Sequence, residues 1–435
     1  MTIQKFRWDT LSDEGRNRIL KRSGRDIDSL TEVVRPIMES VRVEGDRALI
    51  RYAREFDGAD LTAAGVQVSP DEFTAAAQAL PPRVADAVDY AVENVRRFHR
   101  AQVQQSMMTV HVRPGILATE RYTPIDSVGL YVPGGRGSFP SMLYMLAVPA
   151  VLAGVPTVAV TTPPRPDGTV DPAVLYAAGV CGVKTVIKAG GAQAVAALAW
   201  GTETVPPVAK IVGPGSAYVA AAKRLVADRI DVGLPAGPSE SIVLADETAD
   251  PRIVALDLMI EGEHGSDSAA LLITHSSELA DSVAREIEKL LPQVPQPRRT
   301  YLTDVFQGYG GIVLTTGVDQ SVQVVNTFAP EHLLIHARDA RALSHSITNA
   351  AEILIGPHTA FSLANYAAGP NAVLPTGGWA CTWGPVSVRD FQKASSVIEV
   401  TSQGYAEMKD HVIALADHEG FYTHAAALRN RPDLP

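Results

Sequence analysis

Hydrophobic and polar residues follow two different periods along this chain of 435 residues, and the period changes near residue 127. Before that point, apolar residues recur every three or four positions, the spacing of amphipathic helices, which predicts helices over residues 26–43 and 83–105. After it, short apolar runs alternate with amphipathic stretches, a pattern typical of βαβ units around a parallel sheet. The predicted strands span residues 127–132, 157–162, 185–188, 210–212, 241–245, 269–274, 312–316, 333–336 and 353–355.

These strands form two groups that separate near Ser239, which indicates an α/β protein with two Rossmann-like, doubly wound domains. From about residue 387 the pattern returns to helix and turn, with little apolar core of its own. We expect a helical extension over residues 1–26, a first α/β domain from 27–126 with 240–381, a second Rossmann-like domain from 127–239, and a tail over 382–435.

Composition narrows the class of protein. The net charge of -10 argues against a nucleic-acid partner, because phosphate binding needs a basic surface. No segment approaches eighteen consecutive apolar residues, and the first residues lack the apolar core of a signal peptide. The two cysteines, Cys181 and Cys381, are too few for a disulfide framework. We expect a cytoplasmic enzyme with reduced thiols and no membrane contact.

Two short motifs each have two interpretations. The turn from Gly135 to Pro140 follows a predicted strand and precedes a helix, as a dinucleotide-binding turn does, but proline replaces its third glycine. An ordinary strand-to-helix turn fits equally well. Cys381 is either a nucleophile toward an aldehyde or a small buried filler, and the absence of an adjacent base in the sequence favours the filler.

Metal- and proton-handling residues gather in the second half of the chain. Glu261 and His264 stand three apart in a segment with helical spacing, so both can face one cation. An imidazole with carboxylate and amide oxygens suits zinc, although such a pair is also common on solvated helix faces. Glu331 and His332 follow Pro330 directly. Neighbours within a strand point to opposite faces, so this pair is expected at a strand start or turn.

Seven segments of the chain match a known pattern: residues 128–135, 189–199, 210–215, 234–240, 263–265, 329–333 and 373–376. In this order they resemble the histidinol dehydrogenase family along nearly the whole chain. The resemblance implies a zinc- and NAD-dependent alcohol dehydrogenase that oxidises a primary alcohol through an aldehyde to a carboxylate in two hydride transfers. It also implies a homodimer with shared active sites, in which the C-terminal tail crosses to the partner subunit.

The resemblance also implies roles for individual residues. His332 would act as the base that takes the hydroxyl proton, and Glu331 would activate water for attack on the aldehyde. The implied zinc ligands are Glu261, His264, Asn365 and His424. The implied cofactor contacts are Tyr131, Gln193 and Ser216, where Asn is usual at the third position. The implied substrate contacts are Ser239, Glu419, His332 and the four zinc ligands.

Departures from the family pattern concern the substrate. At the implied zinc site the usual Gln and Asp are Glu261 and Asn365 here, so the number of carboxylate ligands stays at one. At the substrate end a usual Glu is Phe361 and a usual His is Ala372. Those two losses would leave the charged groups of histidinol unpaired. The expected substrate is therefore 2,3-dihydroxypropane-1-sulfonate, oxidised to sulfolactate. The alternatives are L-histidinol and a catalytically silent metal- or NAD-binding homologue.

Overall fold

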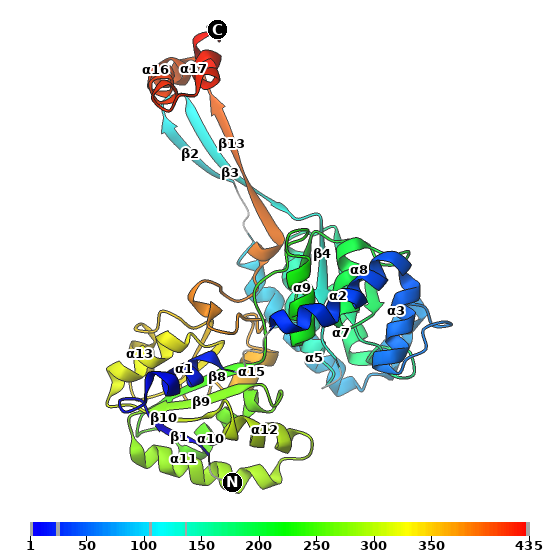
Figure 1. The fold of residues 1–435 in the computed structure, drawn as a ribbon, viewed down its shortest axis with the longest axis vertical. Helices are drawn as coiled ribbons and strands as arrows, with labels where there is room; N and C mark the ends of the chain where they lie inside the picture. The colour runs from blue at the N-terminus through cyan, green and yellow to red at the C-terminus, as the bar shows by residue number, and fades with distance from the viewer. Residues whose placement is uncertain (1–2, 23–26, 104–106, 135–136, 432–435) are drawn as a thin grey trace. The chain divides into compact units, whose positions relative to one another are not determined.

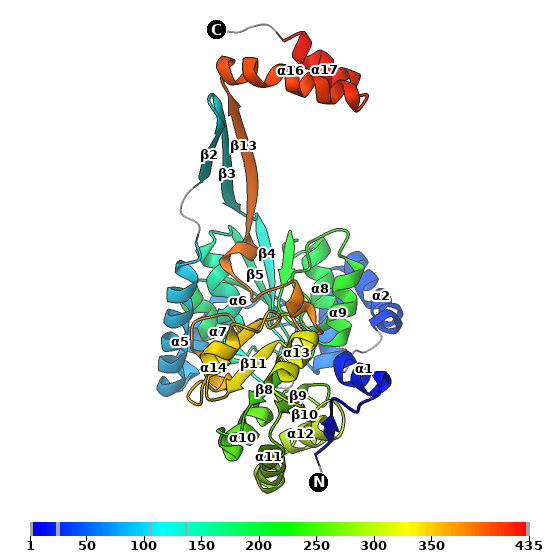
Figure 2. The same ribbon diagram turned by 90° about the vertical axis from the view of Figure 1, so that its left-hand side faces the viewer.

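The computed structural model describes residues 3–22, 27–103, 107–134 and 137–431. The chain forms two compact units, Met1–Gln102 with Asp126–Phe391, and Val103–Ile125 with Gln392–Pro435. The first unit contains two parallel sheets (Figures 1 and 2). None of the helices among the described residues combines the length and apolar character that crossing a membrane requires.

The larger sheet has six parallel strands in the order β1-β10-β9-β8-β11-β12. The chain winds outward from β8 through β9 to β10, and then returns to place β11 and β12 on the other side of β8. The direction of winding therefore reverses between β8 and β11. The strands are β1 (Lys5–Arg7), β8 (Glu240–Ala245), β9 (Ala269–Thr274), β10 (Gly311–Leu314), β11 (His332–His336) and β12 (Glu352–Ile355).

Helices cover both faces of this sheet because its strands are apolar on both sides. Val243 and Ala245 pack with α10, α11, α12 and α15, whereas Ile242 and Leu244 pack with α13 and α14. The helices are α10 (Pro251–Gly262), α11 (Ser277–Leu290), α12 (Arg298–Gln307), α13 (Val318–Phe328), α14 (Ala340–Ser344) and α15 (Phe361–Tyr366). Helix α1 (Asp13–Lys21) adds apolar side chains to the α13 side.

The smaller sheet has four parallel strands in the order β6-β5-β4-β7. Its strands are β4 (Ser127–Tyr131), β5 (Thr157–Thr162), β6 (Thr185–Lys188) and β7 (Lys210–Val212). Its crossover helices are α6 (Pro140–Leu152), α7 (Pro172–Cys181), α8 (Gly191–Trp200) and α9 (Ala217–Leu225). The expectation of parallel-sheet α/β architecture is confirmed for both sheets.

The N-terminal helices pack on the helices of this smaller sheet: α2 and α3 lie on α8 and α9, and α4 and α5 lie on α6 and α7. They are α2 (Ile27–Glu44), α3 (Asp46–Tyr52), α4 (Pro70–Ala79) and α5 (Pro82–Arg100). This differs from the expected grouping of residues 27–126 with the later strands. The amphipathic period predicts that a helix buries one face, but it does not say which sheet lies beneath.

The second unit consists of an antiparallel sheet in the order β13-β3-β2 and two helices, α16 (Ser402–His418) and α17 (Tyr422–Arg429). The strands are β2 (Met108–Arg113), β3 (Ile116–Pro124) and β13 (Gln392–Val400). The prediction of helix and turn from residue 387 was wrong for β13. Its residues are mostly exposed and lack apolar alternation, and the strand exists because it pairs with β3 from Gln392 opposite Pro124 to Val400 opposite Ile116.

Candidate active site

Three strand starts at the amino edge of the larger sheet bring carboxylates and an imidazole together. β11 begins at His332, directly after Glu331, as predicted from the proline before the pair. The register places His332 beside Ser241 of β8 and Glu352 of β12. The backbone N–H of Glu240 donates to the Glu331 carboxylate at 2.8 Å, which fixes that side chain at the sheet edge.

The imidazole of His332 lies between two carboxylates. Its Nδ1 is 2.8 Å from Oε2 of Glu352, and its Nε2 is 3.8 Å from Oε1 of Glu331. Burial by itself would lower the pKa of His332, but the negative charges of Glu261, Glu331 and Glu352 outweigh it and raise the pKa to about 10. Glu352 was missed in the sequence, and only its cross-strand position opposite His332 reveals it.

Two further carboxyl groups of the cluster have raised pKa values. Burial raises the pKa of Glu331 well above its usual range, although the charge of His332 opposes the shift. Burial also raises the pKa of Glu240 to about 7. The guanidinium of Arg22 lies 3.1 Å from the Glu240 carboxylate and limits that shift. A carboxyl group whose pKa is raised toward neutrality is suited to proton transfer.

Glu261 and His264 come together at the end of α10, next to Asn365 of α15. The amide nitrogen of Asn365 lies 2.6 Å from Oε1 of Glu261, and Nδ1 of His264 lies 3.3 Å from Oε2. The hydroxyl of Ser239 is 2.9 Å from the same Nδ1. Glu261 is fully buried, yet its Oε2 has no hydrogen-bond partner. A buried carboxylate oxygen without a donor fits a bound cation.

The remaining two predicted residues of this site belong to the second unit. His424 is an exposed residue of α17 whose ring centroid is 5.0 Å from that of Phe421. Glu419 is the exposed C-cap of α16. Within the described residues, no three His, Cys, Asp or Glu side chains converge as a metal site. The first unit therefore provides Glu261, His264 and an amide, and the role of His424 stays a prediction.

The predicted cofactor residues follow strands of the smaller sheet. Tyr131 ends β4, and Ser216 is the N-cap of α9 after the neighbouring strand β7, without a side-chain capping bond. The winding reverses between β4 and β7, and dinucleotides bind outside the carboxyl ends of strands at such a reversal. Gln193 lies buried in the first turn of α8. Gly135 and Arg136 of the glycine-containing turn lie outside the described residues.

Local contacts fix the carboxyl ends of β4 and β7, where the predicted cofactor residues lie. The Tyr131 hydroxyl accepts a hydrogen bond of 3.0 Å from the N–H of Gly191, and burial raises its pKa to about 12. Gly213 has a φ of +130° and would place a Cβ 2.2 Å from the Tyr131 carbonyl oxygen. Only glycine allows the turn after β7 to approach β4 this closely.

Arg298, at the start of α12, is a second residue that the sequence did not reveal. Its guanidinium donates to the Glu263 carbonyl at 2.9 Å, beside His264. Its other terminal nitrogen lies next to Gly137, in the turn between β4 and α6: a Cβ added to that glycine would be 3.5 Å from the nitrogen. A half-buried cation therefore lies between the loop of His264 and the turn that follows β4 of the smaller sheet.

Two predictions about neighbouring residues can be compared with the structure. Cys381 is exposed, in a short turn at Trp379–Cys381, so the interpretation as a buried filler was wrong. Its turn contributes no apolar residue to a core, which composition could not show. Phe361 is fully buried and packs its ring edge-on against His332, with 5.8 Å between ring centroids, whereas Ala372 is half-buried.

Asp57 is a further unpredicted carboxylate, at the end of the π-helical turn Ala53–Asp57. Its Oδ2 is buried without a hydrogen-bond partner, and burial raises its pKa to about 6. Its charge in turn raises the pKa of Tyr131. π-helical turns and carboxyl groups with raised pKa values are each common at functional sites.

We expect Asp57→Asn to stabilise the protein at pH 7. The folded state binds the Asp57 proton more tightly than the unfolded chain does, so the free energy of unfolding falls as pH rises from about 4 to about 6. Asparagine does not titrate, so the substitution should raise the free energy of unfolding at pH 7 by about 1–2 kcal/mol after allowance for partial exposure. Thermal unfolding of the variant and of the unmodified protein, at pH 4.5 and at pH 7, measures this difference in stability. Asp60→Asn is the control with opposite sign, because hydrogen bonds from Thr62 lower the pKa of Asp60 to about 2. Equal destabilisation by both changes would contradict the assignment.

Comparison with known proteins identifies the family. The model of the family described as histidinol dehydrogenase matches residues 20–432. The chain belongs to the histidinol dehydrogenase family. A Rhizobium meliloti protein named histidinol dehydrogenase homolog is 49% identical over 98% of this chain and 94% of its own length. Histidinol dehydrogenase from Synechocystis is 47% identical over 98% of both chains.

A solved relative shares the fold over nearly the whole chain. The crystal structure of histidinol dehydrogenase from Elizabethkingia anophelis matches with a TM-score of 0.92 at 32% identity, covering 98% of this chain and 97% of that one. The family membership expected from the seven segments is thereby confirmed.

Proposed function

We propose that this member of the family oxidises a primary alcohol to a carboxylate through an aldehyde, with NAD as hydride acceptor and zinc at Glu261. The observation that carries the proposal is the series of contacts Glu331, His332 and Glu352 at the sheet edge. The buried carboxylate of Glu261 adds to the negative charge around His332. An oriented imidazole and a carboxyl group of raised pKa are the two proton-transfer groups that consecutive oxidations of an alcohol and an aldehyde hydrate require.

Each of these side chains has a definite task. His332 takes the hydroxyl proton as hydride leaves the carbon, and Glu352 holds the imidazole through Nδ1 so that Nε2 faces the substrate. Glu331 takes a proton from the water that adds to the aldehyde, and the hydrate then loses the second hydride. Zinc held by Glu261, His264 and Asn365 would acidify the substrate hydroxyl and offset the carboxylate charge that keeps His332 protonated.

Two side chains, Phe361 and Arg298, favour an anionic substrate over a cationic one. The ring of Phe361 packs against His332 where the family pattern has a carboxylate, so a cationic amine has no partner there. The guanidinium of Arg298 lies beside the loop that carries His264 and offers a charge of the opposite sign. We infer that 2,3-dihydroxypropane-1-sulfonate is oxidised to sulfolactate. Oxidation of L-histidinol to L-histidine is the second candidate, favoured by the 47% identity to the Synechocystis enzyme of that name.

A substrate comparison separates the two candidates. Zinc-loaded protein with NAD should release about two NADH per molecule of dihydroxypropanesulfonate, as two hydride transfers require, and should oxidise histidinol slower by orders of magnitude because its buried charge has no partner. The measurement is NADH absorbance with limiting substrate. Efficient turnover of histidinol would replace the sulfonate assignment while leaving the two-step chemistry intact.

Arg298→Met tests the anion contact. Loss of a charge-assisted hydrogen bond should raise KM for dihydroxypropanesulfonate by about 10- to 100-fold, with little change for propane-1,2-diol, which lacks the anion. Arg299→Met is the matched control, since the neighbouring Nε donates to the Val294 carbonyl instead. An increase confined to KM for NAD would instead assign Arg298 to the cofactor pyrophosphate.

A further inference from the structure

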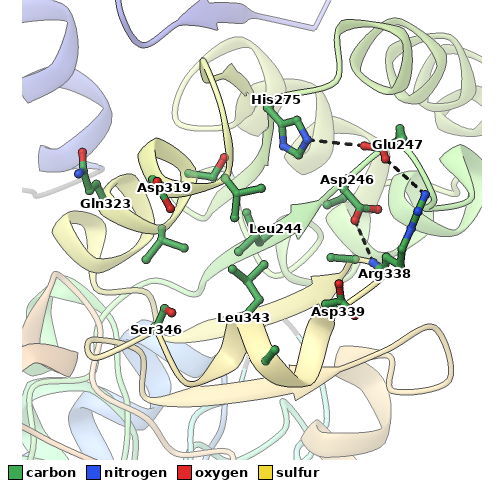
Figure 3. Close-up of a pocket in the computed structure, with 16 residues that line it drawn as sticks. Leu244, Asp246, Glu247, His275, Asp319, Gln323, Arg338, Asp339, Leu343 and Ser346 are labelled. Carbon is green, nitrogen blue, oxygen red and sulfur yellow. Dashed lines mark hydrogen bonds and ion pairs between the residues drawn. The ribbon is translucent and has the colours of Figure 1, made fainter.

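A cavity of about 820 Å³ lies at the edge of the larger sheet opposite the candidate active site (Figure 3). It is lined by residues 244–247 at the end of β8, by the first turns of α13, by residues 337–346 after β11, and by His275. Glu331 and His332 stand at the other end of β11. A strand of five or six residues separates the two edges by about 15–17 Å.

The topology of the sheet explains why a cavity forms here. After β8 the chain leaves toward α10 on one face, and after β11 it leaves toward α14 on the other face. The two connections diverge and leave a crevice between the carboxyl ends of neighbouring strands, where open α/β sheets generally bind ligands. Its volume is within the range of small-molecule sites.

The cavity has an apolar floor and an acidic rim. Leu244, Val318, Val322 and Leu343 provide the apolar surface, and Asp246, Glu247, Asp319 and Asp339 carry the carboxylates. The two basic side chains of the lining, Arg338 and His275, each lie 3.6 Å from Glu247. Among the residues that the structure describes, Asp319 and Asp339 form no ion pair. The rim therefore keeps an excess of negative charge over an apolar surface.

Hydrogen bonds hold Asp246 of the rim in place, and the connection after β8 lacks a dinucleotide-binding turn. The carboxylate of Asp246 accepts from the backbone N–H of Thr248 and of Arg338, at 3.0 and 2.9 Å. Burial would raise its pKa, but these bonds together with that of the Thr248 hydroxyl keep it below the usual range. The connection after β8 contains no glycine, and the Asp250 side chain already accepts from the first amides of α10. A dinucleotide-binding turn needs glycines and free backbone amides at the start of the following helix, and this connection has neither.

We propose that this cavity binds a small organic cation, an ammonium compound whose apolar body lies on Leu244 and Leu343 while its charge faces Asp319 and Asp339. Charge complementarity selects the ammonium group, because carboxylates accept hydrogen bonds and cannot donate them. The apolar floor selects a ligand with a hydrocarbon body over a hydrated metal ion. The site lies apart from the residues assigned to oxidation.

Three probes with the same phenyl body test the charge selection on the full-length protein. Calorimetry and ligand-observed NMR should show saturable binding of 2-phenylethylammonium, binding about 10-fold weaker for 2-phenylethanol, and none for 3-phenylpropanoate. Equal binding of the three probes, or no saturable binding of the ammonium compound, overturns the proposal.

Variants locate the bound probe. Asp319→Asn with Asp339→Asn should weaken ammonium binding by about 5- to 10-fold, whereas the exposed pair Asp71→Asn with Asp228→Asn should leave it unchanged. Ala342→Trp fills the cavity from α14 and should abolish binding with an unaltered unfolding temperature. Glu261→Gln should retain binding, because the probe does not use the oxidation site. Loss in Glu261→Gln together with retention in the cavity variants would place the probe at the oxidation site and refute the assignment.

Discussion

His264→Ala is expected to remove bound zinc and to abolish alcohol oxidation while the fold survives. The side chain of His264 is 44% exposed and lies outside the hydrophobic core, so its removal should delete a zinc ligand without destabilising the fold. Glu261→Gln removes the ligand charge in the same shape and keeps an acceptor for Asn365. Zinc content by metal analysis, circular dichroism and NADH production after zinc loading measure the three effects. His358→Ala is a control, because that histidine is also exposed and lies outside the cluster.

The fourth ligand can be tested by subunit exchange. If His424 completes the site of a partner subunit, mixed dimers of His264→Ala and His424→Ala contain one site with both histidines intact. About a quarter of full activity is then expected from a statistical mixture with half of the protein in mixed dimers and one active site in each. Proven exchange without recovery would refute a shared site, and full zinc content in His264→Ala would refute the ligand set itself.

The strands that build the two parallel sheets could be predicted because they are buried on both faces. Residues 157–162, 185–188, 210–212 and 269–274 are short apolar runs bounded by turns, and each forms a strand with those limits. The position of Glu331 and His332 at a strand start followed from Pro330. In both cases the information is local in the sequence.

Features that depend on distant partners could not be predicted. β13 is a strand because β3 pairs with it, and its own residues are mostly exposed and show no apolar alternation. Glu352 is twenty residues from His332 and reaches it only through the register of β11 and β12. Arg298 shows no motif and acquires its place between two loops from the packing of α12. Long-range pairing, rather than residue type, decides all three.

The contact between Glu352 and His332 predicts that the two residues have different effects on catalysis. His332→Asn removes the proton acceptor for both oxidations and should slow each by about 10²–10⁴. Glu352→Gln keeps a hydrogen-bonding group but removes one of the negative charges that raise the pKa of His332. The neutral imidazole then persists to lower pH, so the ascending limb of the pH–rate profile should move down in pH as the maximal rate falls. A residue with a merely structural role would lower the rate without moving that limb.

Glu331 should affect the two half-reactions unequally, because only the second one needs an activated water. Glu331→Gln keeps the hydrogen bond from the Glu240 N–H but cannot take a proton, so oxidation of added aldehyde should fall by about 10²–10⁴ while oxidation of the alcohol falls far less. Stopped-flow measurement of NADH with alcohol and with aldehyde as separate substrates distinguishes the steps. The protein should then accumulate aldehyde and stop near one NADH per alcohol molecule. Equal losses in both steps would mean that Glu331 orients His332, 3.8 Å away, and that another group activates the water.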